Sequence, residues 1–380
     1  MATHPAIIVP ALKGPLTIQH VPTWKPAHRE IQVRVEWVPS APLDVWQVDA
    51  GLMVQFPQTL GDTAAGTVVA VGPEVKHLQV GDRVFGMFFQ NKTQKGQQVY
   101  VTAPETLFGK VPQSIPLSAA ATIPTNFCTA FFALFEKLKI ELPWPRPDKF
   151  TPSDKDVPVL IWGAASSVGQ SAVQILKHWG YTNVIATASP KHHERIKAYG
   201  AAHVFDYRDP NVTASILELL ASQGHSESIR VFDTVASKYG SLIPISKIAT
   251  QSGSAVAAVL PVVISTSAEK DGLKLSPDVS AEAPWASGVE IHPIVVYNYE
   301  EFGLIIFRLQ NQFLRDHLQA EIMPTLLAQG AIEPNKQQVV KGETLLDRAR
   351  KALDIMRSGT VSGERLVWQV WTEEEFPEFK

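Results

Sequence analysis

Cysteine, excess charge and long apolar runs are all scarce in this chain of 380 residues. The only thiol belongs to Cys128, so neither an intrachain disulfide framework nor a cysteine-based zinc cluster can form. The net charge of −3 gives no reason to expect binding to nucleic acid or to an anionic membrane. We also expect no membrane-spanning segment and no secretory signal, because apolar runs are short and the first residues lack a basic stretch. These absences favour a cytoplasmic protein, long enough for two domains.

The segment 157–181 has the pattern of a buried strand, a tight turn and a helix. In dinucleotide-binding units, such a turn of small residues lets the backbone approach a pyrophosphate, and the helix N-terminus offers N–H groups to it. Of the three glycines in the usual fingerprint only Gly169 is present, so this segment alone equally allows an ordinary strand–helix turn. The candidate contacts to the pyrophosphate are Ala165, Ser166, Ser167 and Val168.

Residues 5–110 have the pattern of an irregular β-barrel. Apolar and polar residues alternate over 31–37, which predicts a half-buried strand. Glycine and proline recur at short intervals and predict tight turns between short strands. The first part of the chain is therefore expected to be a β-rich domain rather than a helical one.

The string GDTAAGTVVAVGPEVKHLQVGDRVFG, Gly61 to Gly86, resembles the signature of the medium-chain dehydrogenase/reductase superfamily. The resemblance extends from about residue 5 to residue 371. It implies an α/β protein with a GroES-like β-barrel catalytic domain formed by residues 1–125 and 330–380. It also implies a Rossmann NADPH-binding domain, a doubly wound parallel sheet, formed by residues 126–329.

The chain departs from the zinc-dependent members of this superfamily at their metal ligands. Those members carry His-Glu after the first glycine of the signature, where this chain has Asp62 and Thr63. The loop 40–44, which resembles the loop of their catalytic cysteine, contains no cysteine, and the cysteine-rich lobe for structural zinc is missing. Because zinc requires a cluster of thiolate, imidazole or carboxylate ligands, we predict no metal site. The chain thus resembles the zinc-independent branch, with the quinone and enoyl reductases.

The end of the predicted strand 183–188 indicates which nicotinamide cofactor is bound. A carboxylate there would bond the ribose 2′-hydroxyl of NAD and repel the 2′-phosphate of NADP. This chain instead has Ser189, Lys191 and His192, which suit a phosphate dianion, although a solvated basic turn is the alternative. Tyr207 resembles a family residue beside the same phosphate. We therefore predict NADPH rather than NADH.

The resemblance implies further cofactor contacts outside this corner. Thr129 resembles a threonine that meets the cofactor near its phosphates, although its hydroxyl could equally bond the backbone of its own helix. Strand ends collect ligands in parallel sheets, which favours Val259 and Leu260 for the nicotinamide side. In the terminal motif, Val361 and Ser362 would fall near the cofactor, and Arg365 is either a cofactor contact or a surface charge.

The chemistry left to a metal-free member is hydride addition to an electrophilic carbon. In an α,β-unsaturated carbonyl, hydride adds to the β-carbon, charge moves to the enolate oxygen, and the α-carbon needs a proton. No catalytic residue is identifiable: Tyr297 is a possible acid but also a candidate core or interface tyrosine, and solvent could supply the proton. The candidates for the substrate cleft are Trp46, Gln47, Asn126, Val295 and Tyr297.

The resemblance is closest to the trans-acting enoyl reductases of fungal polyketide pathways. It depends on the turn Ser189-Pro190, the strand end at 205–207 and the terminus 362–367. It implies NADPH-dependent reduction of a small-molecule or carrier-bound enoyl substrate, with a polyketide synthase as a partner. A stand-alone quinone or small-enone oxidoreductase and a non-catalytic NADPH-binding protein are the alternatives. The substrate, the stereochemistry and the choice between a monomer and a homodimer stay open.

Overall fold

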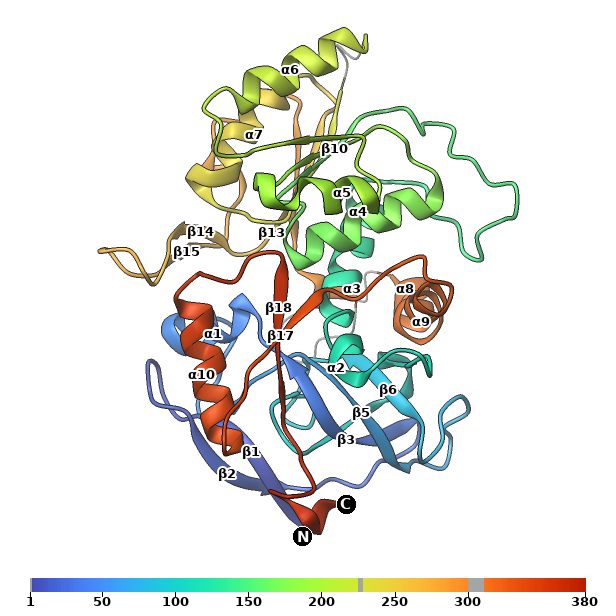
Figure 1. Ribbon diagram of the computed structural model, residues 1–380, viewed down its shortest axis with the longest axis vertical. Helices are drawn as coiled ribbons and strands as arrows, with labels where there is room; N and C mark the ends of the chain where they lie inside the picture. The colour runs from blue at the N-terminus through green and yellow to red at the C-terminus, as the bar shows by residue number, and fades with distance from the viewer. Residues whose placement is uncertain (1, 225–227, 300–310) are drawn as a thin grey trace. The chain divides into compact units, whose positions relative to one another are not determined.

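The computed structural model describes residues 2–224, 228–299 and 311–380, and it divides the chain into two compact units (Figure 1). The first unit contains Met1–Thr125 and Tyr297–Lys380, and the second contains Asn126–Val296. The chain leaves the first unit at the predicted position. It returns at Tyr297, however, and not at residue 330 as the sequence suggested.

The reason for this correction lies in the helical segment 312–328, which packs on the β-rich unit. Buried Gln319 bonds Met87 twice: its Oε1 accepts from the Met87 N–H at 2.6 Å and its Nε2 donates to the Met87 carbonyl at 2.9 Å. The segment is helical from Gln312 onward, and residues 300–310 lie outside the described residues. The segment consists of α8 (Gln312–His317), η7 (Leu318–Ile322) and α9 (Met323–Ala328).

The first unit is built mainly of antiparallel strands. Its strands are β1 (Thr3–Val9), β2 (Thr17–Pro22), β3 (Glu30–Pro39), β4 (Gln58–Thr59), β5 (Thr63–Val71), β6 (Arg83–Met87), β7 (Tyr100–Pro104), β8 (Phe108–Lys110), β17 (Lys336–Val339) and β18 (Glu364–Gln369). One sheet has the order β17-β18-β3-β5-β6-β8, with β7 also paired to β3, and a second has the order β2-β1-β4. The half-buried strand expected over 31–37 is confirmed in β3, where Ile31, Val33 and Val35 enter the core.

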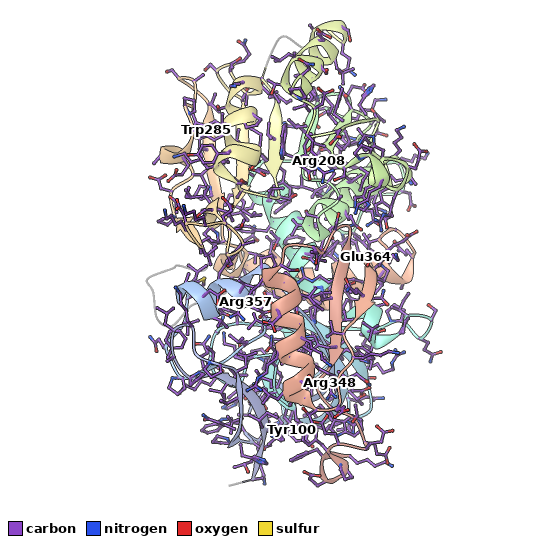
Figure 2. The ribbon with its side chains drawn as sticks, turned by 60° about the vertical axis from the view of Figure 1, so that its left-hand side comes forward. Tyr100, Arg208, Trp285, Arg348, Arg357 and Glu364 are labelled. Atoms are coloured by element: carbon purple, nitrogen blue, oxygen red, sulfur yellow. The ribbon has the colours of Figure 1, made fainter. Side chains whose placement is uncertain are left out.

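Short helices close the first unit. They are α1 (Pro42–Ala50), η1 (Glu105–Leu107), α2 (Leu117–Ala120), α10 (Leu345–Arg357) and η8 (Pro377–Phe379). Arg357 at the end of α10 pairs with Asp49 of α1 through two hydrogen bonds of 2.6 and 3.1 Å (Figure 2). This two-pronged contact fixes α1, which carries the predicted cleft residues Trp46 and Gln47, against the C-terminal helix.

The second unit contains a parallel six-stranded sheet. Its strands are β9 (Val159–Trp162), β10 (Val184–Thr187), β11 (His203–Phe205), β12 (Arg230–Asp233), β13 (Ala255–Val259) and β16 (Glu290–Ile294), and a separate hairpin is formed by β14 (Val262–Ser265) and β15 (Lys274–Ser276). The spatial order β11-β10-β9-β12-β13-β16 is the order 3-2-1-4-5-6 of a doubly wound sheet. The predicted Rossmann topology is confirmed, and its switch point lies between β9 and β12.

Helices connect these parallel strands or lie just before the first and just after the last of them in the chain. They are α3 (Pro124–Phe132), η2 (Ala133–Lys137), α4 (Ser167–Trp179), η3 (Pro190–His192), α5 (His193–Tyr199), α6 (Val212–Ser222), η4 (Lys238–Leu242), α7 (Ile243–Ile248), η5 (Ser280–Glu282) and η6 (Val296–Tyr299). The four residues of β9 are fully buried, as expected for a central parallel strand.

The helical stretch Leu117–Lys137 corrects the expectation that no apolar run reaches membrane-spanning length. It is 21 residues long and apolar enough to cross a bilayer by length and composition. Within its most apolar window, however, 89% is buried inside the protein, and Phe127, Phe131 and Leu134 are among the buried side chains. Core helices of globular proteins pass the same test, and this burial is what such a helix shows.

Candidate active site

The turn between β9 and α4 requires glycine at its first position. Gly163 has φ = +81°, in the left-handed region that disfavours other residues. A Cβ there would lie 2.3 Å from Val235 Cγ2 and 2.9 Å from Thr234 Oγ1. The Gly163 and Ala164 N–H groups bond Thr187 of the neighbouring strand, at 3.0 and 2.8 Å. The Thr234 hydroxyl, just after β12, donates to the Gly163 carbonyl at 2.9 Å, so the turn is bonded to the chain on both sides of β9.

The remainder of this turn explains why serine can replace the second fingerprint glycine and why the third is retained. Ser166 has an extended backbone, open to any residue, and its Oγ caps α4 by accepting from the Gly169 N–H at 2.9 Å. A Cβ on Gly169 would lie 2.6 Å from Ala164 Cα, so only glycine lets the helix pack this closely on the strand. The predicted contacts Ala165, Ser167 and Val168 surround this helix N-terminus, where free amides and the helix dipole favour an anion.

A basic corner forms where β10 and β11 end side by side. Thr187 pairs with Phe205 in register, and the Ala188 N–H donates to the Phe205 carbonyl at 2.9 Å. The segments that begin at Ser189 and Tyr207 therefore leave the sheet at the same edge. Ser189 and His192 are buried, whereas Lys191 and Tyr207 are exposed.

Two arginines join this corner that the sequence analysis missed. Arg195 Nη2 donates to His192 Nδ1 at 3.0 Å, and since a guanidinium cannot accept, the proton of a neutral His192 is on Nε2. The Arg208 guanidinium lies 5.0 Å from the centroid of the Tyr207 ring (Figure 2). The signals in the sequence were the spacing of three residues between His192 and Arg195 and the position of Arg208 next to Tyr207.

The other predicted residues of the second unit occupy its interior or strand ends. Asn126 and Thr129 are buried on α3. Val259 pairs in register with Ile294, and the Leu260 N–H donates to the Ile294 carbonyl at 3.0 Å, so the ends of β13 and β16 are adjacent. Val295 follows that end and is half-buried.

Asp233 at the end of β12 was not anticipated. It is fully buried and accepts hydrogen bonds from the Val235 and Ala236 N–H groups at 2.9 and 3.0 Å and from Ser241 Oγ at 2.5 Å. Burial raises the pKa of this carboxyl to about 6, and the three donors act against that rise. The contacts hold the loop that presents Val235 and Thr234 against Gly163, which gives Asp233 a structural role in shaping the turn.

The first unit contains a buried cluster of ionisable groups, which we call the Asp62 cluster: Asp44, Asp62, Lys95, Tyr297 and Arg365. The Tyr297 hydroxyl donates to Asp62 Oδ2, and Thr63 Oγ1 donates to Asp62 Oδ1 at 3.1 Å. Asp62 directly follows Gly61, the first glycine of the string that resembles the family signature. Among the described residues, no group of three or more His, Cys, Asp and Glu side chains is arranged to hold a metal ion.

Phe89 separates two members of this cluster. The Tyr297 ring stacks on the Phe89 ring with centroids 4.3 Å apart and planes 15° apart. Lys95 Nζ lies 3.4 Å from the centroid of the Phe89 ring and donates to the Phe89 carbonyl at 2.7 Å. Because a stacked ring covers one face, the ammonium must occupy the other face. The phenol ring is thereby held in a fixed orientation.

Burial and mutual charge perturb the titration of the Asp62 cluster. Burial raises the pKa of Asp44 to about 7, and the nearby Asp62 charge adds to the rise. Burial lowers the pKa of Lys95 to about 7, against the attraction of Asp62. Burial, and then Asp62, raise the pKa of Tyr297 well above its usual range, so the phenol is protonated at neutral pH. Perturbed groups of this kind concentrate at functional sites.

The structure excludes one of the two interpretations of Arg365, which were a cofactor contact and a surface charge. Arg365 is only 8% exposed, so its interpretation as a surface charge is wrong.

Asp44 accepts from the Ala41 N–H at 2.8 Å and from Gln97 Nε2 at 3.2 Å. One turn later, the Gln47 side chain is buried, and its Nε2 has no hydrogen-bond partner within the described ranges. Trp46 is half-buried, Val361 packs on the barrel core and Ser362 is exposed.

Tyr297 lies outside the strands of the second unit. Strand β16 ends at Ile294, and Tyr297 belongs to the short helix η6. The phenol side chain is 7% exposed, so the interpretation as a core tyrosine describes its packing, but its hydroxyl bonds an acid rather than the backbone. The residues that the sequence analysis missed in this unit are Asp44, Asp62 as a buried acid and Lys95.

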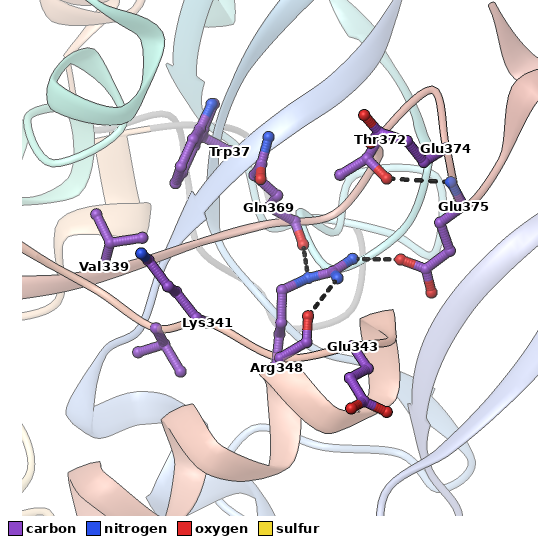
Figure 3. Close-up of a pocket in the computed structure, with 11 residues that line it drawn as sticks. Trp37, Val339, Lys341, Glu343, Arg348, Gln369, Thr372, Glu374 and Glu375 are labelled. Carbon is purple, nitrogen blue, oxygen red and sulfur yellow. Dashed lines mark hydrogen bonds and ion pairs between the residues drawn. The ribbon is translucent and has the colours of Figure 1, made fainter.

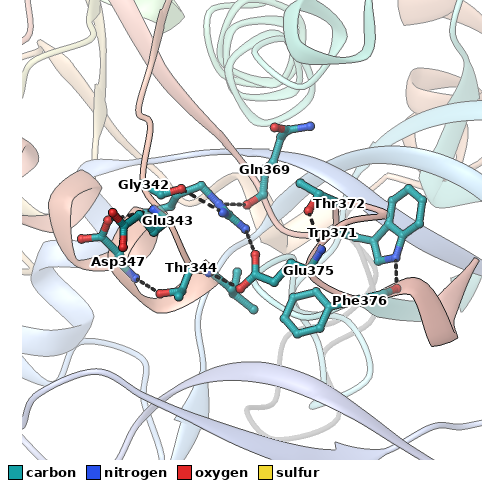
Figure 4. Close-up of polar contacts among 11 residues, drawn as sticks. Gly342, Glu343, Thr344, Asp347, Gln369, Trp371, Thr372, Glu375 and Phe376 are labelled. Atoms are coloured by element: carbon teal, nitrogen blue, oxygen red, sulfur yellow. Dashed lines mark hydrogen bonds and ion pairs between the residues drawn. The ribbon is translucent and has the colours of Figure 1, made fainter.

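A surface hollow of about 580 Å³ lies elsewhere in the first unit and has a structural explanation (Figure 3). Arg348 in its wall donates to the Gln369 carbonyl at 2.7 Å, the Gly342 carbonyl at 3.2 Å and Glu375 Oε2 at 2.6 Å. Glu375 also accepts from the Leu345 N–H at 2.6 Å, so the pair fastens the start of α10 to the C-terminal tail (Figure 4). This guanidinium is fully used by the protein itself.

Comparison with known proteins agrees with this architecture. Residues 27–124 match the alcohol dehydrogenase GroES-like domain. In solved structures, the chain is similar to the CurK enoyl reductase, with a TM-score of 0.68, 20% identity and coverage of 96% of this chain and 99% of that one. It is equally similar to a quinone oxidoreductase from Pseudomonas syringae pv. Tomato DC3000, with a TM-score of 0.68, 21% identity and coverage of 96% and 99%. At these identities the likeness shows the fold.

Sequence relatives place the chain more closely. It is 36% identical over 233 residues to the trans-enoyl reductase tazE of Aspergillus terreus, covering 59% of this chain and 75% of the relative. It is 29% identical over 377 residues to the trans-enoyl reductase mpsG of Macrophomina phaseolina, covering 95% and 99%. It is 36% identical to lovC of Aspergillus terreus, the enoyl reductase component of the lovastatin nonaketide synthase, where the match spans about half of each chain, 49% and 52%. The chain therefore belongs to the medium-chain dehydrogenase/reductase superfamily of oxidoreductases, together with the fungal trans-enoyl reductases.

Proposed function

We propose that the protein uses NADPH to reduce an activated C=C bond, in an enoyl thioester or another α,β-unsaturated carbonyl compound, without a metal ion. The observation that carries the proposal is the pairing of Asp62 with Tyr297 at the position where zinc-dependent relatives bind their metal. A buried phenol and carboxylate can supply a proton but cannot serve as the Lewis acid that ketone reduction uses in those relatives. The names of tazE and mpsG, trans-enoyl reductases, support the same reaction.

The residues of the second unit fit NADPH. The turn at Gly163 and the N-terminus of α4 offer a close backbone and free amides to a pyrophosphate. Ser189, Lys191 and Arg195 offer a hydroxyl and two cations to a 2′-phosphate, and His192 is oriented by Arg195. When bound there, NADPH would supply the hydride.

The first unit supplies the protein groups for the substrate. Burial of the Asp62 cluster excludes water and strengthens every electrostatic interaction within it. The unpartnered Gln47 Nε2 is a donor available to a carbonyl oxygen on which negative charge develops. Hydride addition at the β-carbon of an enoyl group moves charge to that oxygen, so a preorganised donor there favours C=C reduction.

We further propose that the substrate is carried by a polyketide synthase and that the protein works in the cytosol. The proposal is supported by the relative lovC, which is described as the enoyl reductase component of a synthase. A carrier-bound chain is presented at the end of a flexible arm, so the protein would need affinity for the carrier as well as for the acyl chain.

The proposed function is tested by following NADPH oxidation with an enoyl thioester, a simple enone, a quinone and a ketone. NADH in place of NADPH is the control for the cofactor. We expect turnover of the enoyl thioester or the enone with NADPH and no turnover of the ketone. Turnover of the quinone alone would instead identify a quinone reductase, and NADPH binding with no turnover of any free or carrier-bound substrate would identify a non-catalytic protein.

A further inference from the structure

The Asp62 cluster contains more titratable groups than a structural core needs. Two carboxylates, an ammonium, a guanidinium and a phenol are buried together in the first unit. Burying charged groups costs free energy, and well-packed apolar residues are often as stable or more stable in their place. Such a cluster is therefore a candidate for chemistry, provided that one member is positioned to act on a substrate.

Tyr297 is the member with the strongest positional constraint. Its ring stacks on Phe89 at 4.3 Å, and its hydroxyl bonds Asp62, which Thr63 holds in turn at 3.1 Å. It is also the third residue after Ile294, the last residue of β16. The covalent chain alone keeps its Cα within about 11 Å of that strand end. In doubly wound sheets, ligands collect at the carboxyl ends of the strands.

We propose that Tyr297 is the proton donor to the α-carbon of the substrate, and that Asp62 and Phe89 are positioning residues that aim its hydroxyl. This assignment depends on the proposed function, since it names the acid for that reaction. Hydride adds to the β-carbon, and the electrons of the C=C bond move to place negative charge on the carbonyl oxygen. The O–H bond of Tyr297 then breaks, a C–H bond forms at the α-carbon, and the C=O bond is restored.

The phenolate left on Tyr297 is accommodated by the cluster and takes up a proton from solvent once the product has left. Arg365 is the cation whose charge favours the phenolate, and Asp62 and Asp44 act against it. Lys95 lies behind Phe89 and offsets the charge of Asp62. The direction of transfer is favourable because a thioester or ketone enolate is a stronger base than a phenolate. Asp62 thus serves mainly for orientation, and it also keeps the phenol protonated until the enolate forms.

The test compares Tyr297→Phe with wild type in D₂O. Product from wild type should carry deuterium on a single face of the α-carbon. Tyr297→Phe retains the ring on Phe89 but has no proton to give, so deuterium should enter from both faces as solvent protonates the enolate. We also expect kcat to fall by about 10²-fold or more. The Kd for NADPH should not change, which shows that the nucleotide-binding unit is folded.

Two further variants separate proton donation from packing. Tyr100→Phe is the matched control, because it removes a phenol of the same unit that donates only to the Phe379 carbonyl at 3.2 Å, and it should leave rate and stereochemistry unchanged. Asp62→Asn still accepts from Tyr297 but removes the charge that raises the pKa of the phenol. It should retain single-face deuteration and shift the alkaline limb of the pH–rate profile to lower pH.

Single-face deuteration in the product of Tyr297→Phe would overturn the assignment whatever its rate, and so would scrambled deuteration in Tyr100→Phe. The experiment tests the proposed function separately from the assignment of Tyr297. If wild type reduces neither the enone nor the enoyl thioester, free or carrier-bound, the proposed reaction is wrong and so is the assignment of Tyr297. If wild type reduces them and Tyr297→Phe behaves like wild type, the assignment alone is wrong.

Discussion

Removing the guanidinium of Arg195 should weaken the binding of NADPH and leave the binding of NADH nearly unchanged. Arg195 lies at the basic corner beyond β10 and holds His192 through a 3.0 Å hydrogen bond. A charge-assisted hydrogen bond to phosphate contributes roughly 1.5–3 kcal/mol, or about 10- to 150-fold in Kd. Arg195 is partly exposed and screened by solvent, so the lower end of this range, about 10-fold, is the expected loss for Arg195→Ala. NADH has no 2′-phosphate, and its Kd should stay within about twofold.

The assay is a titration of both cofactors by nicotinamide fluorescence at low and high ionic strength. The matched control is Lys197→Ala on the same helix, which removes an equal charge from an exposed side chain paired with Glu194 at 3.2 Å. Arg195→Lys should recover part of the loss, because an ammonium provides charge but not the planar fork. Equal losses in the Arg195 and Lys197 variants, or an unchanged ratio of NADPH to NADH affinity in Arg195→Ala, would show that Arg195 does not bind the 2′-phosphate.

Three other changes have expected outcomes. Gly163→Ala adds a Cβ 2.3 Å from Val235 at φ = +81° and should lower the free energy of unfolding in urea by about 2–5 kcal/mol. The control is Gly272→Ala, at φ = +69° with open space around it, which should show only the backbone cost of about 1–2 kcal/mol. Folding raises the pKa of Asp44 from 3.8 to about 7, so between these pH values the folded state binds more protons than the unfolded state. The free energy of unfolding should therefore fall as pH rises from 4 to 7, and Asp44→Asn should remove this fall. A difference in stability between wild type and Asp44→Asn that stays constant over this pH range would contradict the prediction. Gln47→Met removes a buried unpartnered donor and should raise the free energy of unfolding by about 1 kcal/mol while kcat/KM falls by about 10-fold, and a variant that is both more stable and fully active would show that the amide serves no substrate.

Sequence patterns identified the nucleotide-binding half well because its constraints are local. The strand, turn and helix of 157–181 are contiguous in the chain. The apolar residues of β9 indicate its burial, and Gly169 indicates the close packing of the helix on the turn. The absence of two fingerprint glycines weakened the sequence evidence for a dinucleotide-binding turn. The structure shows instead that a serine with an extended backbone caps the helix at one of these positions.

The Asp62 cluster could not be assembled from the sequence because its members are far apart along the chain. Asp62 and Tyr297 are separated by 235 positions, and neither carries a local pattern. Arg365 was equally compatible with solvent and with a buried site, and only its packing decides. The second domain boundary was also misplaced, because Gln319 binds the backbone of Met87, a contact between residues 232 positions apart.

The most direct test of the central claim is the position of the transferred hydride. The protein is incubated with an enoyl thioester and NADPH that carries deuterium at both positions of its nicotinamide C4, and the product is analysed by mass spectrometry and NMR. We expect one deuterium on the β-carbon of a saturated thioester. Deuterium on the former carbonyl carbon, in an aldehyde or alcohol product, would show carbonyl reduction and contradict it, and so would an unreduced thioester beside a turned-over quinone.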